Sequence, residues 1–291
     1  MTKSFSIMVR ILCFMFLQSL VFAVAGASIM QDLPGNAGDT VAAPDPQGLF
    51  ASLIPLLLVT FIQGSALTLL VRRLPQSYLH RTGLVFVVIF TAGTVITQTE
   101  SVLFLSDIST PLVKRIILLG VVTSLSAALL GSVLFRAEDR SPIRKAIPWA
   151  VWAVAMFAMG LAHVAIYFIL GYWIIWIHPE ARTFYGGGDL LGFWRHMQMV
   201  SDNAGYLYGV QLLRGLIWAL MAGLLFRKTK GTRAQLAMVT GAVFIAFGTA
   251  PLLIPNPFMP EIVRYLHILE TGLTAIIMAI LAGSLFRSRP H

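Results

Sequence analysis

The chain has 291 residues, of which 57% are hydrophobic and only 11% are charged, and its mean hydropathy is +0.82. Soluble domains carry about 25% charged residues, so the composition excludes an ordinary soluble protein. A net charge of +9 would suggest an anionic partner for a soluble domain. In a membrane protein, however, topology places the basic residues, so no nucleic-acid partner is inferred. The single cysteine, Cys13, excludes an intrachain disulfide.

The N-terminal segment has the features of a signal peptide. Lys3 and Arg10 precede an apolar run over residues 11–24, and small residues follow at 23–27. This order matches a basic start, a short apolar core and a cleavage site. An uncleaved first transmembrane helix is the alternative, so residues 1–27 are assigned to one or the other. Residues 28–47 are rich in Pro, Gly and Asp and are predicted to form a flexible extracytoplasmic linker.

Seven further stretches are long and apolar enough to cross a bilayer. A spanning helix needs about 20 mostly apolar residues, because lipid offers the backbone no hydrogen-bond partner. The stretches are 49–71, 84–105, 113–135, 147–176, 209–226, 235–254 and 262–286. The predicted fold class is therefore all-α, a polytopic integral membrane helix bundle over residues 48–291. It has seven transmembrane helices plus the signal peptide or eighth helix.

Most of the 21 basic residues fall on one side of the predicted membrane. The positive-inside rule makes that side cytoplasmic when the start of the chain is placed inside and the spans alternate. The basic residues on it are Lys3, Arg10, Arg72, Arg73, Arg81, Arg136, Arg140, Arg144, Lys145, Arg227, Lys228, Lys230, Arg233, Arg287 and Arg289. The protein is thus expected in the plasma (inner) membrane with a cytoplasmic C-terminus.

Three of the helices predicted to end at the cytoplasmic face share a pattern of small residues. Residues four apart lie on one helix face, and small ones there let two backbones approach closely in lipid. The pairs are Ala127/Gly131, Ala219/Gly223 and Ala279/Gly283. We therefore expect the cytoplasmic ends of these helices to pack tightly.

A small set of ionisable and amide side chains is predicted within the spans. Such residues are costly in lipid and usually face the bundle interior, so each is a functional candidate. The set is Glu100, Gln98, His163, Gln211, Arg214, Arg264, His267 and Glu270. At 1.5 Å per residue, the carboxylates and Arg214 lie in the outer half of the membrane, with His163 deepest. The pattern predicts a polar pocket that opens outward and ends near His163.

Three chemical interpretations fit this set. A metal site would use two nitrogens and two oxygens, which suit zinc, iron or manganese. Its ligands would be Glu100, His163, His267 and Glu270. The same groups could instead relay protons or bind a cation, or Glu270 could neutralise a buried arginine. No cofactor is assigned beyond this candidate metal. Haem is disfavoured because His163 and His267 lie at different predicted depths.

The connection over residues 177–208 combines a glycine run with an amphipathic stretch. Gly186, Gly187 and Gly188 lack the spacing of a nucleotide-binding loop and follow no predicted strand. The next apolar residues form one helical stripe, which includes Trp194, and Asp189 is placed as the N-cap. We predict an interfacial helix at 189–203 over the mouth of the bundle. The glycines would be the hinge of a lid that includes Trp194, Arg195 and His196.

The function that these features favour is carriage of a small solute or ion, coupled to protons or a cation. Glu100 and Glu270 would accept the proton or cation, and Arg214 or Arg264 would hold an anion. The alternative is an intramembrane metal-dependent enzyme built from the candidate metal ligands. A third possibility is a non-catalytic assembly or sensor component. Beyond the lipid bilayer and the solute, the sequence indicates no partner.

Overall fold

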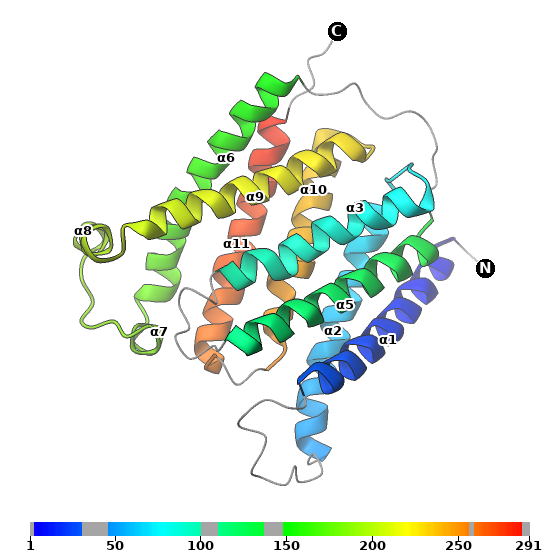
Figure 1. Ribbon diagram of the computed structural model, residues 1–291, viewed down its shortest axis with the longest axis horizontal. Coiled ribbons are helices and arrows are strands. Elements are labelled where there is room, and N and C mark those ends of the chain that lie inside the picture. Colours follow the sequence, from blue (N-terminus) through cyan, green and yellow to red (C-terminus); the bar gives the residue numbers. More distant parts are fainter. Residues whose placement is uncertain (1–2, 31–45, 100–109, 137–147, 256–258, 287–291) are drawn as a thin grey trace. The chain divides into compact units, whose positions relative to one another are not determined.

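A computed structural model describes residues 3–30, 46–99, 110–136, 148–255 and 259–286. All regular secondary structure in these ranges is helical, with no strand, which confirms the all-α fold class (Figure 1). Eight helices in this part of the chain are long and apolar enough to span a membrane. Their bounds are Ser4–Met30, Ser52–Val71, Tyr78–Thr99, Thr110–Leu134, Trp149–Trp176, Tyr206–Lys228, Arg233–Leu253 and Glu261–Leu285. The protein is therefore a multi-pass helical protein suited to a lipid bilayer.

The chain forms two compact units, of which the first comprises Met1–Pro142 and Ala246–Pro255. Its elements are α1 (Lys3–Met30), α2 (Pro46–Val71), α3 (Tyr78–Phe90), the π-helical turn η1 (Thr91–Val95), α5 (Thr110–Leu134) and the 3-10 turn η4 (Ala250–Leu253). Helix α1 contacts both α2 and α5, and α3 also contacts α5 (Figure 1). Turn η4 contacts α2, so a segment distant in sequence completes this unit.

Small residues bring the helices of the first unit close together. A Cβ atom at Gly131 of α5 would lie 3.1 Å from the Leu67 side chain of α2. A Cβ atom at Gly93 would lie 2.9 Å from the carbonyl oxygen of Phe247. The contact at Gly93 is with backbone and is shorter than a Cβ atom tolerates, so glycine is needed there, whereas a Cβ atom at Gly131 would require the Leu67 side chain to shift.

The second unit comprises Ile143–Ile245 and Asn256–His291. Its elements are α6 (Trp149–Leu170), the π-helical turn η2 (Gly171–Trp176), α7 (Pro179–Phe184), α8 (Phe193–Ala204), α9 (Tyr206–Lys228), α10 (Arg233–Phe244) and α11 (Glu261–Leu285). The π-helical turn η3 (Ile245–Thr249) begins here and continues in the first unit. Helix α6 packs along α9, and α11 contacts α6, η2, α7, α9 and α10.

The predicted tight packing at the small-residue pairs is confirmed in this unit as well. A Cβ atom at Gly223 of α9 would lie 2.5 Å from Nε1 of Trp152 in α6. A Cβ atom at Gly283 of α11 would lie 3.0 Å from the Cβ of Ala237 in α10. The same pattern of small residues thus packs against an indole ring between α9 and α6, and against a small side chain of the neighbouring helix between α11 and α10.

Candidate functional site

A buried polar network joins α6 to α9 in the second unit. His163 is 1% exposed, and its Nδ1 lies 3.0 Å from the carbonyl oxygen of Gln211. Because a carbonyl oxygen only accepts, Nδ1 carries the proton and donates it. Arg214 donates from Nη1 to Oε1 of Gln211 over 2.8 Å, and its Cζ lies 5.9 Å from the ring centre of Tyr167. Three of the predicted site residues, His163, Gln211 and Arg214, therefore form one connected group.

Two glycines create the close helix crossing that buries this network. A Cβ atom at Gly215 would lie 2.8 Å from the Cα of Gly160 and 2.6 Å from the Cβ of His163. Gly160 in turn faces Leu212 and Leu216 of α9. The small residue beside His163 therefore admits a neighbouring helix, and this contact shields the network from lipid.

A second polar chain runs along α11. The Tyr185 hydroxyl lies 2.5 Å from Nε2 of His267, and Nδ1 of His267 lies 3.8 Å from Oε2 of Glu270. Thr274 donates from Oγ1 to Oε1 of Glu270 over 3.4 Å. The spacing of three between His267 and Glu270 does place them on one helical face, as the sequence predicts. Together these groups link the half-buried Tyr185 to a carboxylate that is 5% exposed.

Tyr185 is the participant that the sequence analysis missed. It follows α7 and precedes the glycine run, and its phenolic hydroxyl is suited to hydrogen bonding with a histidine. The segment that carries it is held by an apolar cluster of Ile175, Ala181, Val263 and Leu266. Its position next to a glycine turn was visible in the sequence, but its partner lies 82 residues away.

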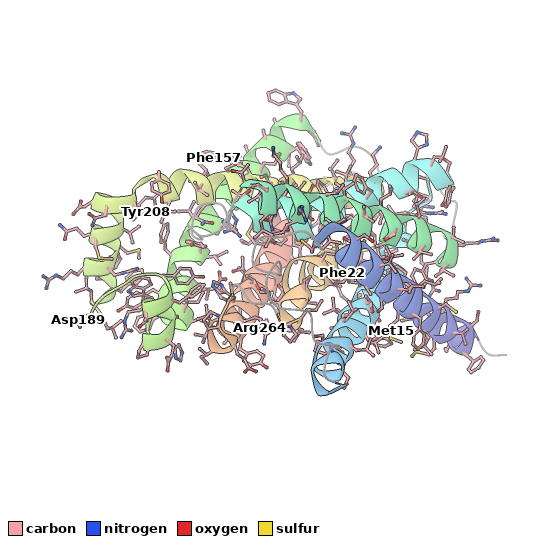
Figure 2. All side chains as sticks on the ribbon, turned by 60° about the horizontal axis from the view of Figure 1, so that its bottom comes forward. Met15, Phe22, Phe157, Asp189, Tyr208 and Arg264 are labelled. Atoms are coloured by element: carbon pink, nitrogen blue, oxygen red, sulfur yellow. The ribbon has the colours of Figure 1, made fainter. Side chains whose placement is uncertain are left out.

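Arg264, at the start of α11, is buried without full hydrogen bonding. It is 5% exposed, and its Nε and Nη1 atoms have no hydrogen-bond partner among the described residues. Its neighbour Tyr265 donates to Glu261, and the guanidinium Cζ of Arg264 lies 5.5 Å from the Tyr265 ring centre. A desolvated guanidinium with spare donors is a strong binding group for an anion. Figure 2 shows where Arg264 lies on α11.

The segment before α8 differs from the sequence prediction at its start. Helix α8 begins at Phe193 and its N-cap is Gly192, so the N-cap prediction for Asp189 is wrong. Asp189 lies in the loop that precedes the helix (Figure 2). Tyr172 of η2 fixes this loop, because its hydroxyl donates to the carbonyl oxygen of Leu191 over 2.6 Å. The helix consequently starts where the loop leaves its anchor on η2.

The expected orientation of one α8 side chain, His196, is also wrong. Trp194 is 82% exposed, so its ring is free to face lipid, and its place on the apolar stripe of an interfacial helix stays a prediction. His196 was placed beside the polar side but is buried, with its ring 4.6 Å from that of Trp176 and 5.5 Å from that of Tyr172. Phe193 and His196, three residues apart on one face of α8, are the side chains that contact the η2 rings. Arg195 is exposed, as expected for the polar side. Burial lowers the pKa of His196, so the docked helix favours the neutral ring.

The glycines of the predicted hinge have distinct structural roles. Gly186 has φ of +68°, a left-handed conformation that favours glycine. A Cβ atom at Gly187 would lie 2.6 Å from the Trp176 ring, whereas Gly188 has open space around it. Arg182 binds the segment through its Nε, which donates to the carbonyl oxygen of Gly188 over 3.2 Å. The loop is therefore anchored at both ends, and hinge motion stays a prediction.

Two of the predicted site residues, Glu100 and Gln98, are not among the polar groups described above for the second unit. Glu100 lies outside the described residues, and Gln98 belongs to the first unit. The four-ligand metal hypothesis includes Glu100 and stays a prediction. Within the described ranges, no group of three His, Cys, Asp or Glu side chains is placed to hold a metal ion.

Comparison with known proteins identified no relative of this chain. No family model matches the chain, and no match was found among curated proteins or solved structures.

Proposed function

We propose that the protein carries a small anionic solute across the membrane together with protons, through polar groups of the second unit. The observation that carries this proposal is the buried guanidinium of Arg264, whose Nε and Nη1 lack a partner in the described structure. A charged side chain inside a bilayer is expensive and marks a substrate or ion pathway more often than a structural feature. Arg264 would bind the anion, and the Arg214 network would supply a second positive charge.

The proton would use the chain of groups along α11. Tyr185, His267 and Glu270 follow one another at 2.5 Å and 3.8 Å, and a hydroxyl, an imidazole and a carboxylate can each donate and accept a proton. Alternate protonation of Glu270 would add or remove a negative charge on the helix that also bears Arg264. Anion affinity and proton occupancy would thereby be coupled.

The proposed orientation follows the basic residues. Lys228 ends α9, Lys230 lies in the loop that follows, and Arg233 begins α10, and the positive-inside rule assigns these residues to the cytoplasm. The opposite end of the unit, with α7, α8 and the start of α11, would then face the exterior of the plasma (inner) membrane. Helix α8 would lie at this outer interface and cover the solute path as a lid.

Reconstitution into liposomes that contain a pH-sensitive dye tests the proposal. The probes are acetate, lactate, succinate and inorganic phosphate, each added outside at a fixed inward proton gradient. We expect at least one anion to accelerate internal acidification in the wild type beyond the rate in empty liposomes. Glu270→Gln should abolish the acceleration, because the amide cannot carry the proton. Arg264→Gln should abolish it by removing the anion site, and Arg264→Lys should retain part of it.

A matched control separates function from a general effect of charge removal. Glu261 lies on the same helix as Glu270, but it is exposed and bonds Tyr265. Glu261→Gln should therefore transport at the wild-type rate. Equal rates for the wild type, Glu270→Gln and Arg264→Gln with every probe would refute carriage through this site.

A further inference from the structure

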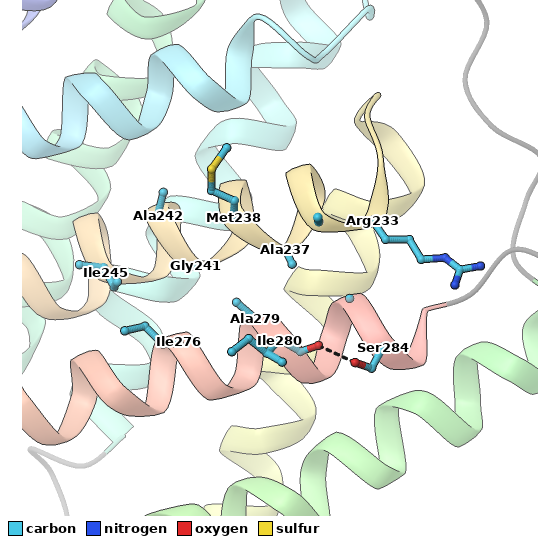
Figure 3. Close-up of a pocket in the computed structure, with 12 residues that line it drawn as sticks. Arg233, Ala237, Met238, Gly241, Ala242, Ile245, Ile276, Ala279, Ile280 and Ser284 are labelled. Atoms are coloured by element: carbon cyan, nitrogen blue, oxygen red, sulfur yellow. Dashed lines mark hydrogen bonds between the residues drawn. The ribbon is translucent and has the colours of Figure 1, made fainter.

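An apolar groove runs between α10 and α11 on the second unit. Its volume is about 640 Å³, and its lining is almost entirely apolar. Figure 3 shows Met238, Ala242 and Ile245 on the α10 side and Ile276 and Ile280 on the α11 side. None of the residues of the proposed transport site lines it, so the groove is separate from that function.

The groove follows from the way the two helices meet. A Cβ atom at Gly241 would lie 3.2 Å from the Cβ of Ala279, and one at Gly283 would lie 3.0 Å from the Cβ of Ala237. Small residues therefore bring the backbones together and form a shallow floor. Larger side chains beside them form the walls. Ile280 is 60% exposed and Met238 is 53% exposed, so the walls of the groove present apolar surface outward.

One end of this apolar groove is basic. Arg233 lines it there, and Arg233 is also the first residue of α10 (Figure 3). The amino end of a helix favours negative charge, because its first amides point outward and its dipole is positive there. Lys228 and Lys230 lie in the preceding five residues and add positive charge to the same loop region. An occupant with an apolar body and an anionic end would match both parts of the groove.

The length of the groove matches one leaflet of a bilayer. Its lining on α10 and the first residue of η3 extends from Arg233 to Ile245, which is about 18 Å at 1.5 Å per residue. One leaflet contributes about 15 Å of hydrocarbon, since the full core is about 30 Å thick. An acyl chain that begins at the headgroup level would thus run the length of the groove while its phosphate stays beside Arg233.

We propose that this groove binds an anionic phospholipid, with an acyl chain between α10 and α11 and the phosphate at Arg233. These helices are surrounded by lipid, so acyl chains are always present beside the groove. Basic pockets between transmembrane helices at the cytoplasmic side are suited to anionic headgroups. The headgroup charge selects the lipid, and the groove immobilises its chain.

Native mass spectrometry of the purified full-length protein tests this assignment. The protein is incubated in detergent with equal amounts of phosphatidylglycerol and phosphatidylcholine that have identical acyl chains. The wild type should retain phosphatidylglycerol in preference. Arg233→Gln should lower the ratio of bound phosphatidylglycerol to phosphatidylcholine about fivefold, and Arg233→Lys should keep it. Ala242→Leu should reduce retention of both lipids, because the larger side chain fills the groove.

Two control variants carry the same chemical changes elsewhere. Arg136→Gln removes an exposed positive charge beyond α5, and Ala165→Leu enlarges an exposed position on α6. Both should bind lipid as the wild type does.

Unchanged lipid retention in Arg233→Gln and Ala242→Leu would overturn the proposal. So would a change from dimer to monomer in Ala242→Leu without loss of lipid, since the groove would then hold a second copy. If Arg233→Gln does not fold, Ala242→Leu alone decides.

Discussion

Helix α1 is joined to the rest of the first unit by buried polar side chains. Gln18 is 3% exposed, donates from Nε2 to the carbonyl oxygen of Thr123 over 2.9 Å, and accepts from Oγ of Ser126 at 3.0 Å. Ser19 and Thr60 share a further hydrogen bond of 2.8 Å between α1 and α2. A signal peptide is removed after export and needs no such partners. We therefore expect α1 to be retained in the mature protein as a transmembrane helix.

The substitution Gln18→Leu measures how much these contacts contribute. Hydrogen bonds between membrane helices average about 0.6 kcal/mol, so the two bonds of Gln18 come to about 1.2 kcal/mol. Loss of Gln18 leaves neither partner orphaned, because the one hydroxyl proton of Ser126 can then be donated to the carbonyl oxygen of Thr123 at 2.8 Å. The decrease in the free energy of unfolding should therefore stay at about 1.2 kcal/mol, below the cost of leaving a buried polar group without a partner.

Two measurements test the prediction. The intact mass of protein purified from membranes should correspond to a chain that still contains α1. Unfolding in mixed micelles should show a destabilisation of about 1.2 kcal/mol in Gln18→Leu. Ser28→Leu makes a similar change at an exposed position of α1 and should have no effect. A mature N-terminus after Ala25 or Ala27, together with unchanged unfolding of Gln18→Leu, would refute the reasoning and favour the signal peptide.

Three further predictions concern the second unit. Because burial lowers the pKa of His196, the undocked helix binds a proton more readily, and docking of α8 should weaken as pH falls below about 6.5. Amide protection in α8, corrected for intrinsic exchange, should show this loss in the wild type but not in His196→Gln. Gly187→Ala forces a Cβ atom to 2.6 Å from the Trp176 ring and should destabilise the loop by about 1–3 kcal/mol, measured by the same exchange. Gly215→Ala presses on the backbone of Gly160 and should lower the thermal unfolding midpoint, whereas Gly209→Ala, which has open space, should not.

The helices were predictable because lipid imposes a strong and local requirement. Each span must satisfy its own backbone, so an apolar run of sufficient length identifies it without knowledge of its neighbours. The pairing of small residues was predictable for the same reason, since Ala279 and Gly283 lie on one face of one helix. What the sequence could not supply was the partner of that face, Ala237 of α10, which is a property of the tertiary structure.

The candidate site was predictable only where its geometry is local. His267 and Glu270 lie three residues apart on one helix, and so their proximity follows from helical periodicity. The link from His163 to Gln211 depends on the crossing of α6 and α9, and that of Tyr185 to His267 depends on the fold of the loop after η2. The burial of His196 was missed because it depends on tertiary contacts with the rings of Tyr172 and Trp176 in η2, which periodicity along α8 does not show.

The contrast between Arg233 and Arg264 shows why position matters more than charge in this protein. Both are arginines in the first turns of spanning helices, but Arg233 is exposed in a basic loop, whereas Arg264 is 5% exposed. A charge at the interface is placed at little cost and serves orientation and lipid contact. Burial of a guanidinium is costly where its donors lack partners, and Nε and Nη1 of Arg264 have none among the described residues. An anion that binds Arg264 would relieve that cost, which is the physical reason for placing solute recognition there.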